Sequence, residues 1–180
     1  MKWLIASDIH GAASRCRRMA EVFRCEGADR LILLGDLLYH GPRNDLPDDY
    51  NPKEVIRILN ELSDRILAVR GNCEAEVDQM VLQFPVMAEY AWFVSGGSLV
   101  YLTHGHIQGE ENPPALSAGD ILLTGHTHVP KCARHDSWIY MNPGSVGIPK
   151  GGSVPGYMIC EDGKFTWKDL DHMVPYMEYG

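Results

Sequence analysis

The chain has 180 residues, of which 45% are hydrophobic and 22% are charged, which favours a single soluble domain over residues 1–180 with a buried core. Its formal net charge of −8 disfavours a long nucleic acid as a partner, because an acidic surface repels the phosphate backbone. No apolar run reaches the roughly 20 residues of a membrane span, so we expect no membrane partner.

The first half of the chain alternates between strand-like and helix-like patterns. The expected elements are, in turn, strand, helix, strand, helix and strand over residues 2–7, 14–27, 30–35, 51–64 and 65–69. Ser14 is the expected cap of the first helix, which ends at Gly27, and Asn51 caps the second with Pro52 at its first position. This order predicts parallel strand pairing with helices on the faces of the sheet.

The second half of the chain has mostly strand patterns. A hairpin around Gly96 and Gly97 is expected over residues 91–105. Further strands are expected at 120–125, 137–142, 156–162 and 164–170, with a hairpin turn in "EDGK" between the last two. The loops 40–52 and 142–152 are long and rich in Pro and Gly, which is typical of functional loops. The apolar tail 172–180 either packs on the sheet or forms an oligomer contact.

The cysteines indicate a reducing compartment. Their number is odd and none forms a C-x-x-C pair, which disfavours a disulfide framework or a zinc knuckle. The start "MKWLIASD" has too few apolar residues for a signal peptide. We therefore expect a cytoplasmic location.

Polar side chains follow five of the expected strands. They are Asp8, His10, Asp36, Asn72, His104, His126 and His128. The carboxyl ends of strands border the functional crevice of open α/β sheets, and carboxylate, amide and imidazole groups suit a divalent metal. In an extended segment His126 and His128 would point to the same side. Seven such groups exceed the needs of one ion and suit two ions that share a carboxylate.

Several short motifs resemble a known family in their order and spacing. They are "DIHG" (8–11), "GDLLYHG" (35–41), "GNC" (71–73), "HGH" (104–106) and "GHTH" (125–128). Over residues 1–148 the chain resembles the calcineurin-like metallophosphoesterases, and "HGPRN", "AVRGNC", "EVDQM" and "NPGSV" resemble the small bacterial YfcE-like phosphodiesterase subfamily. The resemblance implies an α/β fold in which a two-sheet β-sandwich is flanked by helices, in a four-layer α/β/β/α arrangement. It also implies an enzyme that hydrolyses phosphodiester bonds.

The resemblance implies a ligand set for two divalent metal ions. Asp8, His10 and His128 would hold the first ion, Asn72, His104 and His126 the second, and Asp36 would bridge both. A hydroxide between the ions would attack a small phosphate ester. Mn²⁺ is the expected metal, with Zn²⁺, Ni²⁺, Fe²⁺ and Mg²⁺ as alternatives, and a dimer or tetramer is a possible assembly.

One position departs from the common family pattern, Gly-Asn-His followed by Glu or Asp. Here Cys73 stands where that histidine stands, and a thiol is a poorer acid for an alkoxide leaving group. We therefore expect Cys73 to take the catalytic position and to favour diesters over monoesters. Arg43 and Asn44 are candidates for holding a substrate phosphate or base, although a loop arginine is more often a solvated charge.

Other functions on the same fold remain alternatives. A retromer subunit with this fold is a non-catalytic protein-binding scaffold, but it has lost a key histidine and this chain retains every expected ligand. A phosphomonoesterase is also possible. A protein serine/threonine phosphatase is disfavoured by Cys73 and by "YHG" in place of Asp-Arg-Gly. Lys150 is either a phosphate contact or, more commonly, a solvated lysine, and His40 and His106 are either supporting residues or ordinary loop residues. The substrate could be a cyclic nucleotide, a nucleotide diester or another small ester.

Overall fold

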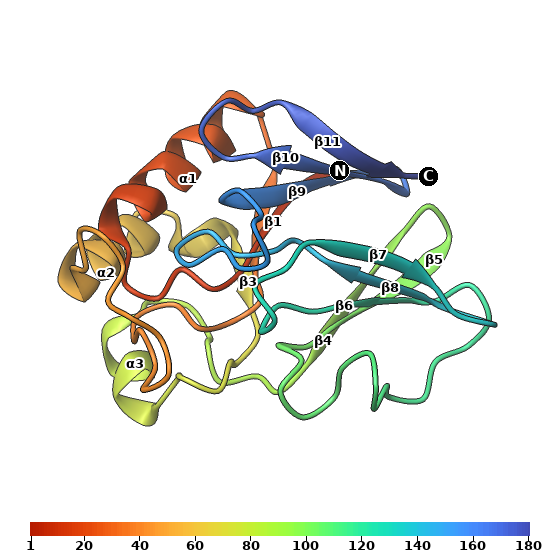
Figure 1. The fold of residues 1–180 in the computed structure, drawn as a ribbon, viewed down its shortest axis with the longest axis horizontal. Helices are drawn as coiled ribbons and strands as arrows, with labels where there is room; N and C mark the ends of the chain where they lie inside the picture. Colours follow the sequence, from red (N-terminus) through yellow and green to blue (C-terminus); the bar gives the residue numbers. More distant parts are fainter.

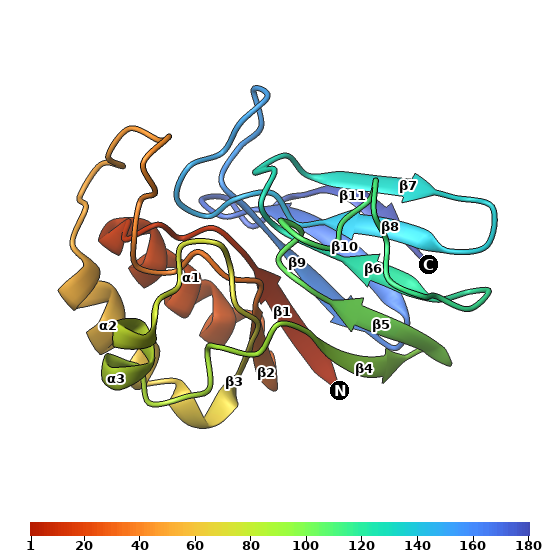
Figure 2. The same ribbon diagram turned by 90° about the horizontal axis from the view of Figure 1, so that it is seen from below.

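Two β-sheets packed face to face form the body of the molecule, which a computed structural model describes over residues 1–180 (Figures 1 and 2). The six-stranded sheet has the order β11-β10-β9-β1-β2-β3, and the five-stranded sheet has the order β4-β5-β6-β8-β7. The first sheet consists of β1 (Lys2–Ala6), β2 (Arg30–Leu33), β3 (Ile66–Ala68), β9 (Gly156–Glu161), β10 (Lys164–Asp169) and β11 (Pro175–Tyr179). The second consists of β4 (Ala91–Ser95), β5 (Ser98–Leu102), β6 (Ile121–Leu123), β7 (Lys131–Arg134) and β8 (Ile139–Asn142).

The central strands are buried on both faces. β1 pairs in parallel with β2, and β2 with β3, as the strand–helix alternation predicts. Leu4 and Ala6 point into the core beneath the helices, whereas Ile5 points into the core between the two sheets. Because both faces are covered, these strands read as continuous apolar runs rather than as alternating patterns.

The helices gather on one side of the sandwich. α1 (Ala13–Cys25), α2 (Pro52–Asn60) and α3 (Glu76–Val81) all lie beside the six-stranded sheet, and a short 3₁₀ helix spans Ser63–Arg65 (Figure 2). None of the three α-helices has the length and apolar character to cross a membrane. The outer face of β4 carries exposed Trp92 and Val94 and no helix. The two-sheet fold class is confirmed, with its helical layer on the first sheet only.

Both expected hairpin turns are confirmed. β4 and β5 pair in antiparallel fashion around Gly96 and Gly97, whose φ angles are 59° and 84°. β9 and β10 pair around Asp162 and Gly163, with φ angles of 49° and 85°. Two consecutive residues with positive φ match the right-handed twist of the flanking strands, which explains the glycines there.

The capping of α1 differs from the sequence-based expectation. Ser14 lies inside the helix, the N-cap is Ala12, and no side chain caps it. The free N–H of Ala13 instead donates to the Asp49 carbonyl of the loop that returns from the second strand. The prediction failed because a distant loop, and not a local side chain, satisfies this helix end. Asn51 does cap α2, accepting from the Glu54 N–H at 3.2 Å.

Three elements were not expected, and one helix is shorter than expected. α2 ends at Asn60, four residues before the expected end. α3 has Val77, Met80 and Val81 at helical spacing but is only six residues long, and β7 has four residues, so both segments are too short for a periodicity to indicate them. The tail forms β11, which pairs with β10 at the edge of the six-stranded sheet. Of the two possibilities for the tail, packing on the sheet is therefore the one observed.

Candidate metal centre

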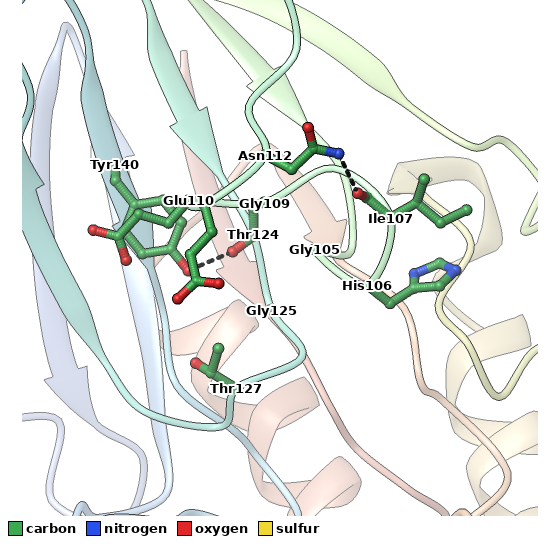
Figure 3. Close-up of a pocket in the computed structure, with 11 residues that line it drawn as sticks. Gly105, His106, Ile107, Gly109, Glu110, Asn112, Thr124, Gly125, Thr127 and Tyr140 are labelled. Atoms are coloured by element: carbon green, nitrogen blue, oxygen red, sulfur yellow. Dashed lines mark hydrogen bonds between the residues drawn. The ribbon is translucent and has the colours of Figure 1, made fainter.

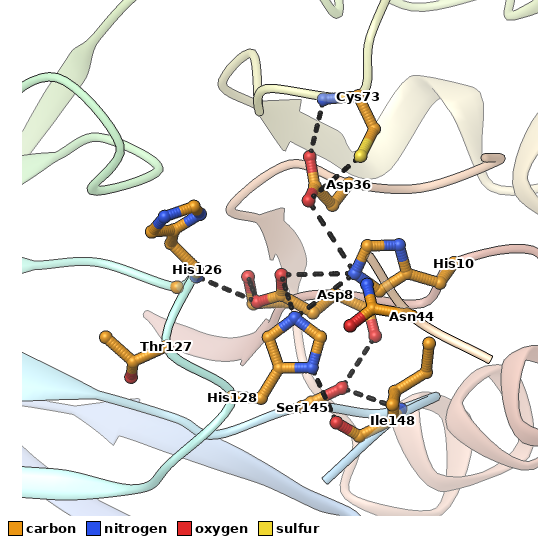
Figure 4. A network of polar contacts seen from close by, with 12 residues as sticks. Asp8, His10, Asp36, Asn44, Cys73, His126, Thr127, His128, Ser145 and Ile148 are labelled. Carbon is orange, nitrogen blue, oxygen red and sulfur yellow. Dashed lines mark hydrogen bonds and ion pairs between the residues drawn. The ribbon is translucent and has the colours of Figure 1, made fainter. Parts of the chain in front are cut away.

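The polar residues that follow the strands meet at one edge of the sandwich (Figure 4). Asp8 and His10 follow β1, Asp36 follows β2, Asn72 follows β3, His104 follows β5, and His126 and His128 follow β6. Both sheets therefore contribute, with the acidic residues on the first sheet and three imidazoles on the second. All of these side chains are buried or half-buried except that of Asn72.

The first group of side chains surrounds Asp8. Its Oδ1 lies 3.2 Å from His128 Nε2 and 3.5 Å from His10 Nε2. The two Nε2 atoms are themselves 3.2 Å apart, and their rings stack with centroids 5.0 Å apart. Three potential ligand atoms thus converge on one point, although His10 and His128 lie more than 100 residues apart in the sequence.

The second group surrounds His104. Its Nε2 lies 3.1 Å from Asn72 Oδ1, 3.2 Å from His126 Nδ1 and 3.4 Å from Asp36 Oδ2. Asp36 Oδ2 is also 3.6 Å from His10 Nε2. Asp36 is therefore the carboxylate that touches both groups, which is the position expected of it.

Backbone carbonyls set the tautomers of three histidines. The Nδ1 atoms of His10, His104 and His128 lie 2.7, 2.6 and 2.5 Å from the carbonyl oxygens of Tyr39, Leu34 and Ile148. A carbonyl only accepts, so each Nδ1 carries a proton and, in the neutral ring, each Nε2 presents its lone pair to the centre. This second contact is the usual device that orients metal-binding histidines.

Two carboxylates dominate the electrostatics of the centre. Burial disfavours the charge of Asp8, but the His10 and His128 imidazoles beside its carboxylate outweigh burial and hold the pKa of Asp8 well below its usual range. Burial likewise opposes the imidazolium form of His104, yet Asp36 and Asp8 raise its pKa to about 9. Burial and the charge of His104 lower the pKa of His126 to about 4. The centre therefore attracts positive charge, as protons or as metal ions.

The donor set fits a divalent cation. Asp8 Oδ1 is buried and has no hydrogen-bond partner, although two imidazole nitrogens lie close to it. A buried, unpaired carboxylate oxygen is costly unless a cation neutralises it. Asp8–His10–His128 and Asp8–Asp36–His104 each bring three ligand atoms within 4.8 Å of one another. These residues can hold a metal ion.

The glycine of "GHTH" allows the second sheet to approach the first. A Cβ on Gly125 would lie 1.9 Å from Ser7 Oγ and 2.7 Å from Asp8 Oδ2. With no side chain there, the His126 N–H donates to Asp8 Oδ2 at 3.0 Å. The close approach brings His126 to its place, and only glycine permits it.

Glu74 is a site residue that the sequence analysis missed. Its carboxylate is buried and accepts the backbone N–H groups of Asp36, Leu37 and Gly71 at 2.9, 2.8 and 2.5 Å. It thereby joins the loop after β2 to the loop after β3, each of which carries a candidate ligand. Its only sequence signal is its place directly after "GNC".

Cys73 lies beside the carboxylate that both groups share. Its N–H donates to Asp36 Oδ1 at 2.9 Å and its Sγ donates to Asp36 Oδ2 at 3.3 Å. Burial and the negative charge of Asp36 raise the pKa of the Cys73 thiol, so it stays protonated at neutral pH. Cys73 is thus a hydrogen-bond donor at the centre and not a thiolate.

A small cleft of about 40 Å³ opens over the centre. Its walls include Arg43 and Asn44, the two substrate-binding candidates, and also Lys150. Lys150 is exposed, and the loop 142–152 places it at the rim of this cleft. His40 instead packs edge-on against Tyr39 and Tyr50.

Comparison with known proteins agrees with this geometry. Residues 1–163 match the calcineurin-like phosphoesterase superfamily domain. Phosphodiesterase YfcE of Escherichia coli (strain K12) is 48% identical over 162 residues, which are 90% of this chain and 88% of the relative.

Solved structures agree with the sequence relatives. A structure of the E. coli phosphoesterase YfcE has a TM-score of 0.96 and 42% identity, over 99% of this chain and 98% of that one. A structure of Vps29 from Entamoeba histolytica shares the fold at 22% identity, with a TM-score of 0.64 over 98% of this chain and all of that one. The matched family domain, the close relative and the converging donor set lead to one conclusion: the chain belongs to the calcineurin-like phosphoesterase superfamily.

Proposed function

We propose that this chain hydrolyses small phosphodiesters at a two-metal centre. Asp8, His10 and His128 would hold one divalent ion, and Asn72, His104 and His126 the other, with Asp36 between them. The observation that supports this most is the contact of Asp36 Oδ2 with an imidazole of each group, at 3.6 Å to His10 and 3.4 Å to His104. The 48% identity to a phosphodiesterase supports the substrate class.

The chain's own residues would position the reactants. When bound, two divalent ions would neutralise the phosphate oxygens and lower the pKa of the water that attacks phosphorus. The attacking water would give up a proton and form the new P–O bond, and the leaving alkoxide would depart with the electron pair of the broken P–O bond and take up a proton, so that an alcohol and a phosphomonoester result. Arg43, Asn44 and Lys150 line the cleft above the centre, where cationic and amide groups would hold the non-bridging oxygens. The Cys73 thiol would donate a hydrogen bond to Asp36 Oδ2 and so hold the shared carboxylate in place.

Mn²⁺ is the metal that we propose, because a mixed set of carboxylate, amide and imidazole ligands suits it. Zn²⁺, Ni²⁺, Fe²⁺ and Mg²⁺ are the alternatives to be tested beside it. The set contains two carboxylates and five neutral ligands, so two divalent ions leave the centre with a net positive charge. A small anionic ester is attracted to such a centre inside a protein of net charge −8.

The test begins with protein stripped of metal by a chelator. Hydrolysis of bis(p-nitrophenyl) phosphate and of p-nitrophenyl phosphate is measured with and without each divalent ion. We expect Mn²⁺ to restore diester hydrolysis and Asp36→Asn to lower the restored rate by at least about 100-fold. Asp136→Asn is the matched control, because Asp136 is exposed and lies outside the centre.

Three results would contradict the proposal. An Asp36→Asn enzyme with the rate of the parent would remove the shared carboxylate from the mechanism. Bound metal without any hydrolysis would favour the alternative of a non-catalytic scaffold. A restored rate that is higher for the monoester would favour a phosphomonoesterase.

Three wider predictions belong with this function. We infer that residues 1–180 act as one domain, because β1 contributes to both hydrophobic cores. We infer a cytoplasmic location, because all five cysteines are unpaired. We also propose a homodimer or homotetramer, supported by exposed Tyr90, Trp92 and Val94 on or next to the uncovered face of β4.

A further inference from the structure

A second and larger cavity lies beside the candidate metal centre (Figure 3). Its volume is about 420 Å³, and it is lined by the loop after β5 together with the end of β6 and Tyr140 of β8. Gly105 in its wall directly follows His104, and Gly125 and Thr127 flank His126. The cavity therefore shares its walls with the segments that carry two candidate ligands.

His106 stands between the centre and the cavity. Its ring centroid lies 5.4 Å from that of His104 and 6.2 Å from that of His126, and its side chain lines the cavity. In Figure 3 His106 lies on one side of the cavity, and Thr124, Thr127, Glu110 and Tyr140 lie on the other. His106 therefore borders both the centre and the cavity, and a substrate arm that leaves the centre on this side meets His106 first.

The cleft over the centre is small and the cavity beside it is large, which matches the small phosphate group and the larger alcohol arm of a diester. The cleft of about 40 Å³ over the centre has room for only a few water molecules, which is enough for a reacting phosphate group. A phosphodiester also carries two alcohol arms, of which one leaves. The cavity of about 420 Å³ lies within the range of small-molecule pockets. It is large enough for the arm that stays on phosphorus.

The walls of the cavity combine polar groups with a similar share of apolar surface. They present the hydroxyls of Thr124, Thr127 and Tyr140 and the carboxylates of Glu110 and Glu111. Thr124 is only 1% exposed, and its Oγ1 lies 2.8 Å from the Tyr140 hydroxyl. Because these two buried hydroxyls bond to each other, the Glu110 and Glu111 carboxylates and the Thr127 hydroxyl are the groups that can form hydrogen bonds with a hydroxylated ligand.

The charges on the walls restrict the arm further. Lys131 Nζ and His135 Nε2 hold the Glu110 carboxylate at 2.6 and 3.1 Å, and Glu111 forms no salt bridge. Two carboxylates facing one space repel a further phosphate group. An arm with a second phosphate, as in a nucleic acid chain, is therefore disfavoured.

We propose that this cavity binds the retained alcohol arm of the diester substrate, and that this arm is a hydroxyl-bearing, uncharged group such as a glycerol, sugar or nucleoside. The proposal rests on the proposed phosphodiesterase function and specifies its substrate class. Glu110 is the residue that selects the arm, because its two salt-bridge partners hold it in place and its carboxylate accepts hydroxyl hydrogen bonds.

The test uses three esters with the same p-nitrophenolate leaving group. Their second arms are propyl, 2,3-dihydroxypropyl and 3-phosphopropyl, and kcat/KM is measured for each with the Mn²⁺-loaded enzyme. We expect the dihydroxypropyl ester to be preferred over the propyl ester by about tenfold or more, because a hydrogen bond to an ionised carboxylate contributes at least that much. The 3-phosphopropyl ester should be the poorest of the three.

Variants connect this preference to the cavity. Glu110→Gln and Glu111→Gln, singly and together, should lower the dihydroxypropyl-to-propyl ratio toward one and improve the 3-phosphopropyl ester relative to the others. Glu178 lies on the distant strand β11 and forms an exposed salt bridge with Lys164, so Glu178→Gln should leave the ratio unchanged. Equal melting temperatures for the variants and the parent establish that each variant is folded.

The outcomes separate this proposal from the function on which it rests. Hydrolysis of the propyl ester with a dihydroxypropyl-to-propyl ratio near one in the parent enzyme would overturn the cavity proposal and leave the phosphodiesterase intact. A high ratio that survives the Glu110 and Glu111 variants would overturn it as well. No hydrolysis of any of the three esters would overturn the proposed function itself.

Discussion

Five residues of the candidate centre have a left-handed backbone. Asp8, His10, Asp36, His126 and His128 have φ angles of 57°, 52°, 56°, 67° and 62°. Non-glycine residues adopt this region rarely, and such strain concentrates at functional sites where the surroundings enforce it. His126 and His128 therefore do not lie in an extended segment, and the expectation that they point to one side is wrong. The turn between them sends one ring to each group.

A prediction about backbone strain follows for His126. Both His126→Gly and His126→Ala remove the imidazole, but only glycine relieves the positive φ. In chelated protein we expect the Gly variant to have the higher free energy of unfolding, by about 1 kcal/mol. Urea denaturation measures the difference. At His106, which lacks a positive φ, the order should reverse, because glycine costs unfolded-state entropy. The same order at both positions would argue against strain at His126.

A second prediction concerns Cys73. The thiol is a weak acid beside Asp36, so it protonates a poor leaving group less well than an imidazolium would. We expect Cys73→His to raise hydrolysis of an alkyl phosphomonoester by about tenfold or more, at unchanged metal content. Cys25→His, at the exposed end of α1, is the control. An unchanged monoester rate with Cys73→His would exclude this residue as the reason for a diester preference.

At the scale of elements, the site depends on loops that neighbouring strands hold in register. β2 and β3 end side by side in a parallel pair, and Glu74 links the loops that follow them through three backbone N–H groups. One carboxylate thus sets the spacing between the loop that carries Asp36 and the loop that carries Asn72.

Glu74→Gln should therefore weaken both the fold and the centre. A carboxamide has one acceptor oxygen, so at least one buried N–H loses its partner, at a cost of about 1–3 kcal/mol in the free energy of unfolding. We expect Mn²⁺ affinity to fall by about 10-fold or more in isothermal titration calorimetry, because the loops would no longer hold their ligands in place. Glu76→Gln, exposed at the start of α3, is the matched control. A destabilised variant with the parent's Mn²⁺ affinity would limit Glu74 to a structural role.

At the scale of the whole molecule, one ionic cluster connects the helical layer to the six-stranded sheet. Glu26, at the end of α1, lies 3.0 Å from Lys2 Nζ and 2.7 Å from Lys168 Nζ, and it accepts from the Tyr157 hydroxyl at 2.8 Å. Burial opposes its charge, but Lys168, Lys2 and Tyr157 outweigh burial and hold the pKa of Glu26 below its usual value.

This cluster predicts a pH-dependent contribution to stability. Because folding lowers the pKa of Glu26, its contribution is present above the unfolded pKa of about 4.3 and is lost as the pH falls through the folded value. Glu26→Gln should lower the free energy of unfolding by about 1–3 kcal/mol at pH 7, and the difference should shrink below about pH 4. Urea denaturation across this range measures it. Glu178→Gln, in an exposed pair with Lys164, should change stability by at most about 0.5 kcal/mol at any pH.

The amino-acid sequence by itself determined the parts of this protein that local rules govern. Apolar runs indicated the central strands, because burial on both faces requires them, and paired turn residues with positive φ indicated the hairpins. The polar residues that end the strands could be named as a metal-ligand set, because a parallel sheet brings the ends of its strands to one edge. Their convergence around Asp36 follows from that topology.

Tertiary structure alone decided the features that depend on distant segments. The Asp49 carbonyl and not Ser14 satisfies the start of α1, and Glu74 accepts from Asp36 and Leu37, which lie 38 and 37 residues away in the loop after β2. α3 and β7 span only six and four residues, which is too short for a periodicity to mark them. The cavity beside His126 joins the loop after β5 to Tyr140, which belong to different strands of the second sheet. Long-range packing brings these groups together, and a local pattern carries no record of a contact whose partner lies elsewhere in the chain.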